Sequence, residues 1–264
     1  MSTPYQTIDE VVRDFAAREA RFRSAADRRC IFLTLYGLVS TEIRSRLNER
    51  YFTDNEWAHR YAVTFANLYR EALERYDAGR LTEVPKAWRL CFDAAKAGNG
   101  LVLQDMFLGV NAHVNNDLPL ALVGASIEPD RALRYKDHTA VNTVLGRITE
   151  RATQRVAALY APGLTAMDEL GGQVDELMSS FSLQVAREGA WESAVSLASA
   201  RTAAERGLVT RLISSRAAVM ARVLLAPTLD PRVVAACRRL EAGTAWMTML
   251  AAAVADARTL TSGT

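Results

Sequence analysis

The sequence is poor in histidine and cysteine, and it lacks the motifs of several common enzyme classes. Three histidines in 264 residues are too few for a trinuclear zinc site. The three cysteines, Cys30, Cys91 and Cys237, are far apart and odd in number, which is typical of reduced core residues and not of a disulfide framework. No Gly-rich phosphate loop, Gly-x-Ser-x-Gly elbow or aspartate-rich prenyl-diphosphate motif is present. These absences exclude the corresponding chemistries as first hypotheses.

The chain also lacks charge of one sign and long hydrophobic runs. It carries 32 basic and 30 acidic residues with no dense Lys/Arg block, so we predict no nucleic-acid partner. The longest uncharged apolar-rich run, Ala242 to Ala255, falls short of the ~20 residues that span a bilayer, so we predict no membrane span. The stretch from Met1 to Phe22 is polar and unlike a signal peptide. We therefore expect a cytoplasmic protein.

Helical periodicity dominates what is present. Apolar residues recur with a period near 3.6, and alternating β-branched runs are almost absent. Capping boxes at Thr7-x-x-Glu10 and Thr53-x-x-Glu56 predict two helix starts. Later helices are expected over about 130–160, 165–187, 188–204, 205–225 and 231–260.

The fold class that follows is all-α: one domain over residues 1–264, a multi-helix bundle around a buried, Pro-kinked central helix. We also expect a hinge near 124–129 and a disordered tail at 261–264. The Ala-rich last helix, with Trp246, closes the core or forms a homodimer surface.

A polar cluster interrupts the apolar segment from Leu101 to Val123. A helix that is apolar on nearly every side belongs inside a protein, so its polar residues need an explanation. At helical spacing the segment presents one polar side, made by Asp105, Gly109, His113, Asn116 and Asp117. Pro119 predicts a kink beside this side, and Gly109 leaves room for a substrate or another helix.

Two interpretations of the cluster stay open. In one, His113 and Asp117 are an ordinary satisfied core pair. In the other, His113 is an acid/base or a ligand oriented by Asp117 or Asp105. Further candidates would bind a substrate through neutral hydrogen bonds or as aromatic walls: Asn111, Asn115, Asn116, His138, Asn142, Trp57, Tyr61, Trp88 and Tyr135.

Three functions follow from this site. The first is an enzyme without a cofactor that acts on a small apolar or aromatic molecule by cyclisation, isomerisation or hydrolysis. The second is a metal-dependent hydrolase of a lipid or phosphoester, with one divalent metal on His113 and Asp117. The third is a non-catalytic ligand-binding or interaction protein. A di-iron site at Glu56 and His59 is disfavoured, because no second Glu-x-x-His motif exists.

The residues from Phe107 to Pro119, FLGVNAHVNNDLP, resemble a Gly-x-Asn-Ala-His-x-Asn-x-Asp-Leu-Pro signature. That signature is typical of an uncharacterised bacterial family, DUF5995, and the similarity extends over roughly residues 15–197. The resemblance implies a helical fold and a site at His113, and it carries no established activity. It makes the polar cluster a family feature and favours the functional interpretation.

Overall fold

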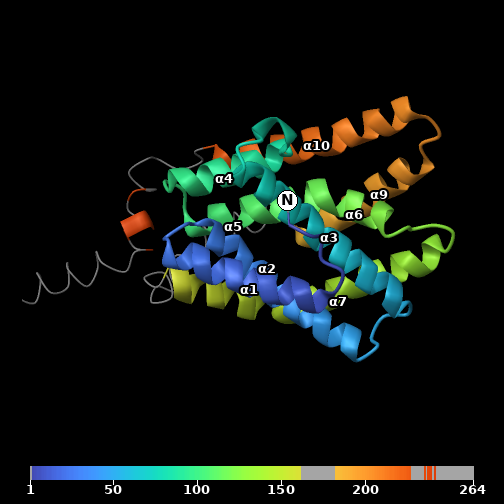
Figure 1. The fold of residues 1–264 in the computed structure, drawn as a ribbon, viewed down its shortest axis with the longest axis horizontal. Coiled ribbons are helices and arrows are strands. Elements are labelled where there is room, and N and C mark those ends of the chain that lie inside the picture. Colours follow the sequence, from blue (N-terminus) through green and yellow to red (C-terminus); the bar gives the residue numbers. More distant parts are fainter. Residues whose placement is uncertain (1, 162–181, 227–234, 236, 240, 242–264) are drawn as a thin grey trace, which may run out of the picture.

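The computed structural model describes residues 2–161, 182–226, 235, 237–239 and 241. Within them every regular element is a helix, which confirms the predicted all-α class (Figure 1). No described helix is both long and apolar enough to cross a bilayer. The predicted helices over 165–181 and 231–260, the run 242–255 and the tail 261–264 lie outside the described residues.

The first three helices are α1 (Ile8–Ser24), α2 (Arg29–Asn48) and α3 (Asn55–Asp77). The predicted capping box of Thr7 and Glu10 is present at the start of α1. The capping box predicted at Thr53 is wrong, because Asp54 caps α3 by accepting the Trp57 N–H at 2.8 Å. The Thr53 and Asp54 N–H groups instead donate to the Asp137 carboxylate, both at 2.7 Å. This contact fixes the start of α3 against α7.

The central segment contains α5 (Val102–Asn111), the π-helical turn η2 (Ala112–Asp117) and α6 (Leu118–Gly124). In η2 the Leu118 N–H donates to the His113 carbonyl, five residues back. In a regular helix the Pro119 ring would collide with the Asn115 carbonyl, and the wider turn relieves that collision. The predicted kink is therefore a π-helical turn that contains the polar cluster itself.

The remaining helices enclose this segment. They are the short 3₁₀ turn η1 (Leu81–Glu83), α4 (Lys86–Ala97), α7 (Arg131–Tyr160), α9 (Leu183–Ser199) and α10 (Ala203–Leu225). The predicted helix boundary at 187/188 is wrong, because α9 begins after the Ser182 N-cap and continues through both residues. Helices α9 and α10 pack against η2, and α2, α4 and α10 pack against α5. The central segment is thus buried on several sides.

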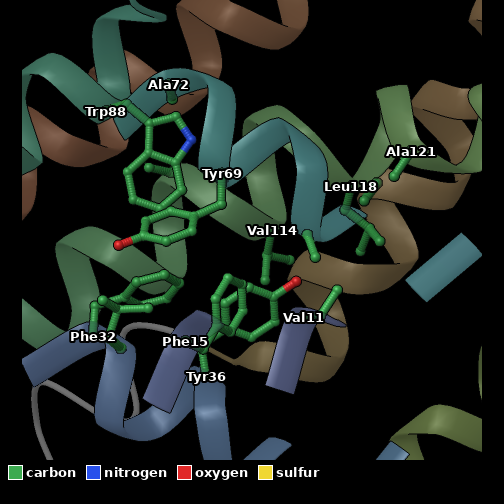
Figure 2. Close-up of a cluster of buried hydrophobic side chains, with 14 of the residues drawn as sticks. Val11, Phe15, Phe32, Tyr36, Tyr69, Ala72, Trp88, Val114, Leu118 and Ala121 are labelled. Atoms are coloured by element: carbon green, nitrogen blue, oxygen red, sulfur yellow. The ribbon is translucent and has the colours of Figure 1, made fainter. Parts of the chain in front are cut away.

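Aromatic side chains fill the space between α1, α2, α3, α4 and η2. Figure 2 shows Phe15, Phe32, Tyr36, Tyr69 and Trp88 in one cluster, and all five are buried. Burial of these aromatic rings stabilises the bundle, because each removes a large apolar surface from water. The cluster also forms the wall behind the polar segment.

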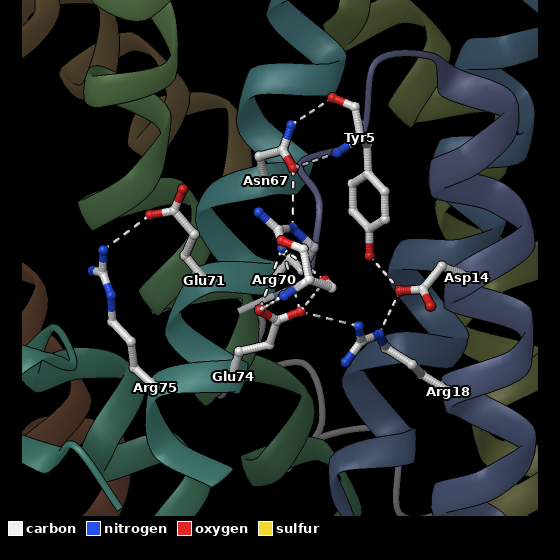
Figure 3. A network of polar contacts seen from close by, with 9 residues as sticks. Tyr5, Asp14, Arg18, Asn67, Arg70, Glu71, Glu74 and Arg75 are labelled. Carbon is white, nitrogen blue, oxygen red and sulfur yellow. Dashed lines mark hydrogen bonds and ion pairs between the residues drawn. The ribbon is translucent and has the colours of Figure 1, made fainter. Parts of the chain in front are cut away.

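A polar network fastens the chain ahead of α1 to α3 (Figure 3). Asn67 accepts the Tyr5 N–H and donates to the Tyr5 carbonyl, each at 2.9 Å. The buried Arg70 guanidinium donates to the Ser2 carbonyl at 2.8 Å. These bonds hold the first turn of α1 in place. Its first residue, Ile8, lines an internal cavity.

Candidate functional site

The centre of the site is a buried pair formed by His113 and Asp117 within η2. His113 is 3% exposed, and its Nδ1 lies 3.0 Å from Asp117 Oδ2. The same carboxylate accepts the Trp88 indole N–H at 2.7 Å on Oδ2 and the Asn116 amide at 2.8 Å on Oδ1. Both Asp117 oxygens therefore have a donor, and the carboxylate holds one defined orientation.

This arrangement selects the tautomer of His113. Because Nδ1 faces a carboxylate, it carries the proton and donates. The opposite ring nitrogen, Nε2, is buried and has no hydrogen-bond partner among the described residues. Burial lowers the pKa of His113, and the hydrogen bond to Asp117 works against that shift. At neutral pH the ring is thus neutral, with a free lone pair on Nε2, which is the state a general base requires.

Aromatic rings surround the imidazole and fix its plane. Phe65 of α3 stacks on His113 with ring centroids 3.5 Å apart and planes 7° from parallel. Tyr36 and Phe32 of α2 contact it edge-on, with centroids at 4.4 and 5.8 Å. Sequence spacing alone does not identify these three residues as neighbours of His113. The only signal for Phe65 is its position one turn from Tyr61 and Tyr69 on the aromatic face of α3.

An apolar cavity of about 190 Å³ lies beside His113, between α2, α3, α5, α7 and α9. Of the predicted site residues, His113 and Tyr61 line it. Most other lining side chains are aliphatic or aromatic, among them Phe32, Leu35, Phe65, Val110, Val141 and Leu145. A dry cavity of ~150 Å³ accommodates benzene, so this space suits a small apolar or aromatic molecule.

Asp105 does not contact His113. It lies eight residues earlier, about 12 Å along the helix axis, and pairs with Arg28, whose Nε is 2.5 Å from Oδ2. Burial raises the pKa of Asp105, while Arg28 opposes the shift. Asp117, and not Asp105, is therefore the carboxylate that contacts and orients His113. Asp105 instead forms an ion pair with Arg28, the N-cap residue of α2.

The three asparagines of the signature are bound by the protein itself. Asn111 donates to the Ala217 carbonyl of α10 at 2.9 Å, and Asn115 donates to Asn111 Oδ1 at 2.8 Å. Asn116 donates to Asp117, as described above. None of the three lines the cavity. The three asparagines thus have structural contacts: Asn111 links the start of η2 to α10, and Asn116 orients the Asp117 carboxylate.

A second polar cluster forms where α7 meets α9. Arg187, which is 3% exposed, donates from Nε to Asn142 Oδ1 at 2.6 Å and from Nη2 to the His138 carbonyl at 2.8 Å. His138 Nδ1 lies 3.4 Å from both Tyr61 Oη and Arg187 Nη2. Burial and then the Arg187 charge lower the pKa of His138 to about 2, so the ring stays neutral. Arg187 lines the cavity, whereas His138 and Asn142 lie behind it.

Of the four aromatic residues predicted as walls, only Tyr61 lines the cavity. Trp57 stacks on Tyr61 from behind, with centroids 5.2 Å apart, and donates its indole N–H to the Ser126 carbonyl at 3.0 Å. Trp88 supports Asp117. Tyr135 is 36% exposed and donates to Glu188 at 3.0 Å.

The described residues gather no metal-ligand set. No group of three or more His, Cys, Asp or Glu side chains lies close enough to hold an ion in the part of the chain described. The two Asp117 oxygens already accept His113, Trp88 and Asn116. The pair thus leaves one nitrogen with a free lone pair, the buried Nε2 of His113, a residue that lines the cavity.

Comparison with known proteins places the chain in a family without assigning an activity. Neither curated proteins nor solved structures match the sequence. The Family of unknown function (DUF5995) matches residues 8–227, a range that contains His113, Asp117 and Arg187. The chain therefore belongs to this family of unknown function.

Proposed function

We propose that the protein is an enzyme that binds a small apolar or aromatic molecule and moves a proton on it without a cofactor. The observation that carries the proposal is the state of His113. Its Nδ1–H is fixed on Asp117, and its bare Nε2 is buried in a ring-lined site that borders the cavity. A buried acceptor without a partner is costly, and a substrate that presents an acidic C–H, N–H or O–H would remove that cost.

The chemistry would run through Nε2. Nε2 takes a proton from the bound molecule, and Asp117 stabilises the imidazolium because its carboxylate already accepts Nδ1–H. His113 then returns the proton at another atom. Such a sequence fits isomerisation or cyclisation, and it fits hydrolysis if a water enters with the substrate. The apolar walls favour the first two, because they disfavour water.

A comparison of wild type with His113→Gln tests the proposal. Each protein is incubated with a bacterial metabolite extract, and both the extract and the compounds retained by the protein are analysed by mass spectrometry. We expect wild type to convert a compound that His113→Gln retains unchanged. Equal conversion by both proteins would remove His113 as the base.

A non-catalytic binding protein is the second candidate, and the nearly apolar lining of the cavity favours it. Retention of the same unchanged compound by both proteins would support it. The metal-dependent hydrolase has less support, because His113 and Asp117 bring no third ligand within the described residues. All three cysteines are free, which agrees with the cytoplasmic location that we propose.

A further inference from the structure

Arg187 is a buried cation without a carboxylate partner in the described part of the chain. The ion pairs of the described residues do not include Arg187, although its side chain is almost wholly enclosed. Burying an unpaired charge is expensive, and natural proteins pair such charges or use them to bind a ligand. The position of Arg187 therefore needs an explanation beyond packing.

The hydrogen bonds of Arg187 leave donors free. A guanidinium carries five N–H groups in a fork that matches a carboxylate. Nε donates to Asn142, and Nη2 donates to the His138 carbonyl, so both bonds end on neutral acceptors. These bonds fix the plane of the guanidinium without neutralising it. The Arg187 side chain also lines the cavity, beside Tyr61.

Neighbouring groups do not cancel the charge by contact. Asp137 also lines the cavity, but its two oxygens accept the Thr53 and Asp54 N–H groups, and it forms no ion pair with Arg187. Tyr61 is a neutral hydroxyl whose pKa burial raises, while the Arg187 charge and a hydrogen bond with the Arg187 side chain oppose that shift. An anion that entered here would meet the Arg187 cation and the Tyr61 hydroxyl, and also the Asp137 carboxylate, whose two oxygens are held by backbone N–H groups.

We propose that Arg187 receives the carboxylate of the molecule that occupies the cavity, so the ligand is an apolar carboxylic acid. This inference rests on the proposed small-molecule function and specifies its substrate class. Tyr61 Oη, now 3.4 Å from His138 Nδ1, supplies a second donor to the same carboxylate. Arg187 is thereby a substrate-binding residue, and Asn142 is a positioning residue that holds its Nε.

The geometry relates this anchor to the proposed base. Tyr61 and Phe65 are one turn apart on α3, about 6 Å along its axis, and their ring centroids are 6.2 Å apart. Tyr61 lies beside the Arg187 cluster, whereas Phe65 stacks on His113. A carboxylate on Arg187 would therefore present the atoms about one helical turn away to Nε2. The acid group orients the ligand, and proton transfer occurs on its apolar part.

Binding of a matched pair of probes tests the inference. The probes are 4-phenylbutyrate and its neutral amide, 4-phenylbutanamide, and affinity is measured by ligand-observed NMR and by the thermal shift of the protein. We expect wild type to bind the acid at least ~10-fold more tightly than the amide, in line with a charge-assisted bidentate contact. Arg187→Gln should remove the preference for the acid over the amide.

A second variant covers the case in which Arg187→Gln does not fold. Asn142→Asp keeps the shape of the side chain and gives the guanidinium an internal carboxylate at its Nε. We expect Asn142→Asp to lose the preference for the acid as well. His113→Gln, by contrast, should retain it, because His113 acts on another part of the ligand.

The outcomes separate this inference from the proposed function. Equal binding of acid and amide by wild type, or a preference that survives in both Arg187→Gln and Asn142→Asp, overturns the role of Arg187 and leaves the small-molecule site standing. Binding of neither probe overturns both proposals. A preference lost in the two variants and kept in His113→Gln supports the assignment.

Discussion

Replacing Gly109 with alanine tests how closely α2 approaches the central helix. A Cβ at this position would lie 2.5 Å from Phe32 Cγ and Cδ2 and 2.8 Å from Phe32 Cβ. The clashing atoms are near the backbone of α2, so a rotation at the end of a flexible side chain cannot relieve them. Phe32 is also held by Tyr69 and Trp88, both with ring centroids at 5.4 Å. We therefore expect the helices themselves to shift.

Two opposing effects set the magnitude. Overpacking a well-filled core typically costs about 1–3 kcal/mol, and the lack of a yielding side chain places this site at the upper end. Alanine is favoured over glycine inside a helix by about 1 kcal/mol, which offsets part of the cost. The expected net loss is about 1–2 kcal/mol of unfolding free energy. Because Phe32 lines the cavity, its displacement should also weaken the binding of apolar probes.

Gly146 provides the matched control. It lies on the exposed side of α7, and a Cβ there would meet nothing within 4 Å. Gly146→Ala should therefore raise the unfolding free energy by about 0.5–1 kcal/mol. Urea denaturation of the two variants and of wild type measures both values. If Gly109→Ala is as stable as Gly146→Ala, the close approach of Phe32 is refuted.

Three further changes test the site. Asp117→Asn should reduce turnover at least ~100-fold, because it no longer fixes the His113 tautomer, whereas Nδ1 protonation seen unchanged by ¹⁵N NMR would contradict the reasoning. Wild type should lose stability as the pH falls below about 6.5. In the unfolded state His138 binds a proton below that pH, whereas in the folded state its pKa is lowered to about 2 and the ring stays neutral. His138→Gln should lessen this loss by up to about 1.4 kcal/mol per pH unit between pH 6 and 5, measured by urea titrations at each pH; an unchanged slope would show that His138 protonates within the fold. Asn111→Ala should cost about 1–3 kcal/mol, because it removes the hydrogen bond to the Ala217 carbonyl and takes the acceptor from the Asn115 amide, and a loss below ~0.5 kcal/mol would argue against those bonds.

The fold class and the central pair could be predicted because both depend on local spacing. Helical periodicity is legible over ten or more residues, and His113 and Asp117 are four apart, within hydrogen-bond reach on one helix. The same spacing rule wrongly grouped Asp105 with His113. It takes no account of Arg28, which lies at the N-cap of α2 and pairs with Asp105. Spacing alone does not say which side of a buried helix meets which neighbour.

The missing residues of the site depend on contacts between distant segments. Phe65 stacks on His113 from another helix, and Arg187 reaches α7 across 45 residues of sequence to Asn142. A single arginine in an amphipathic helix resembles an ordinary surface residue until its burial is known. The boundary predicted at 187/188 also placed Arg187 at a helix end, where a solvated side chain is the normal expectation. Its role becomes visible only with the tertiary structure.

The π-helical turn explains how one segment serves two partners. In a regular helix each residue advances the side chains by about 100°, so one extra residue within a turn rotates everything before it relative to everything after it. Ahead of η2, Asp105 faces Arg28, and at its start Asn111 faces α10. Inside η2, His113 faces the cavity while Asp117 turns toward Trp88. Pro119 favours this wide turn, because its ring would collide with the Asn115 carbonyl in a regular helix. The proline and the polar cluster therefore act together, because the wide turn directs His113 toward the cavity and keeps the Asp117 carboxylate out of it.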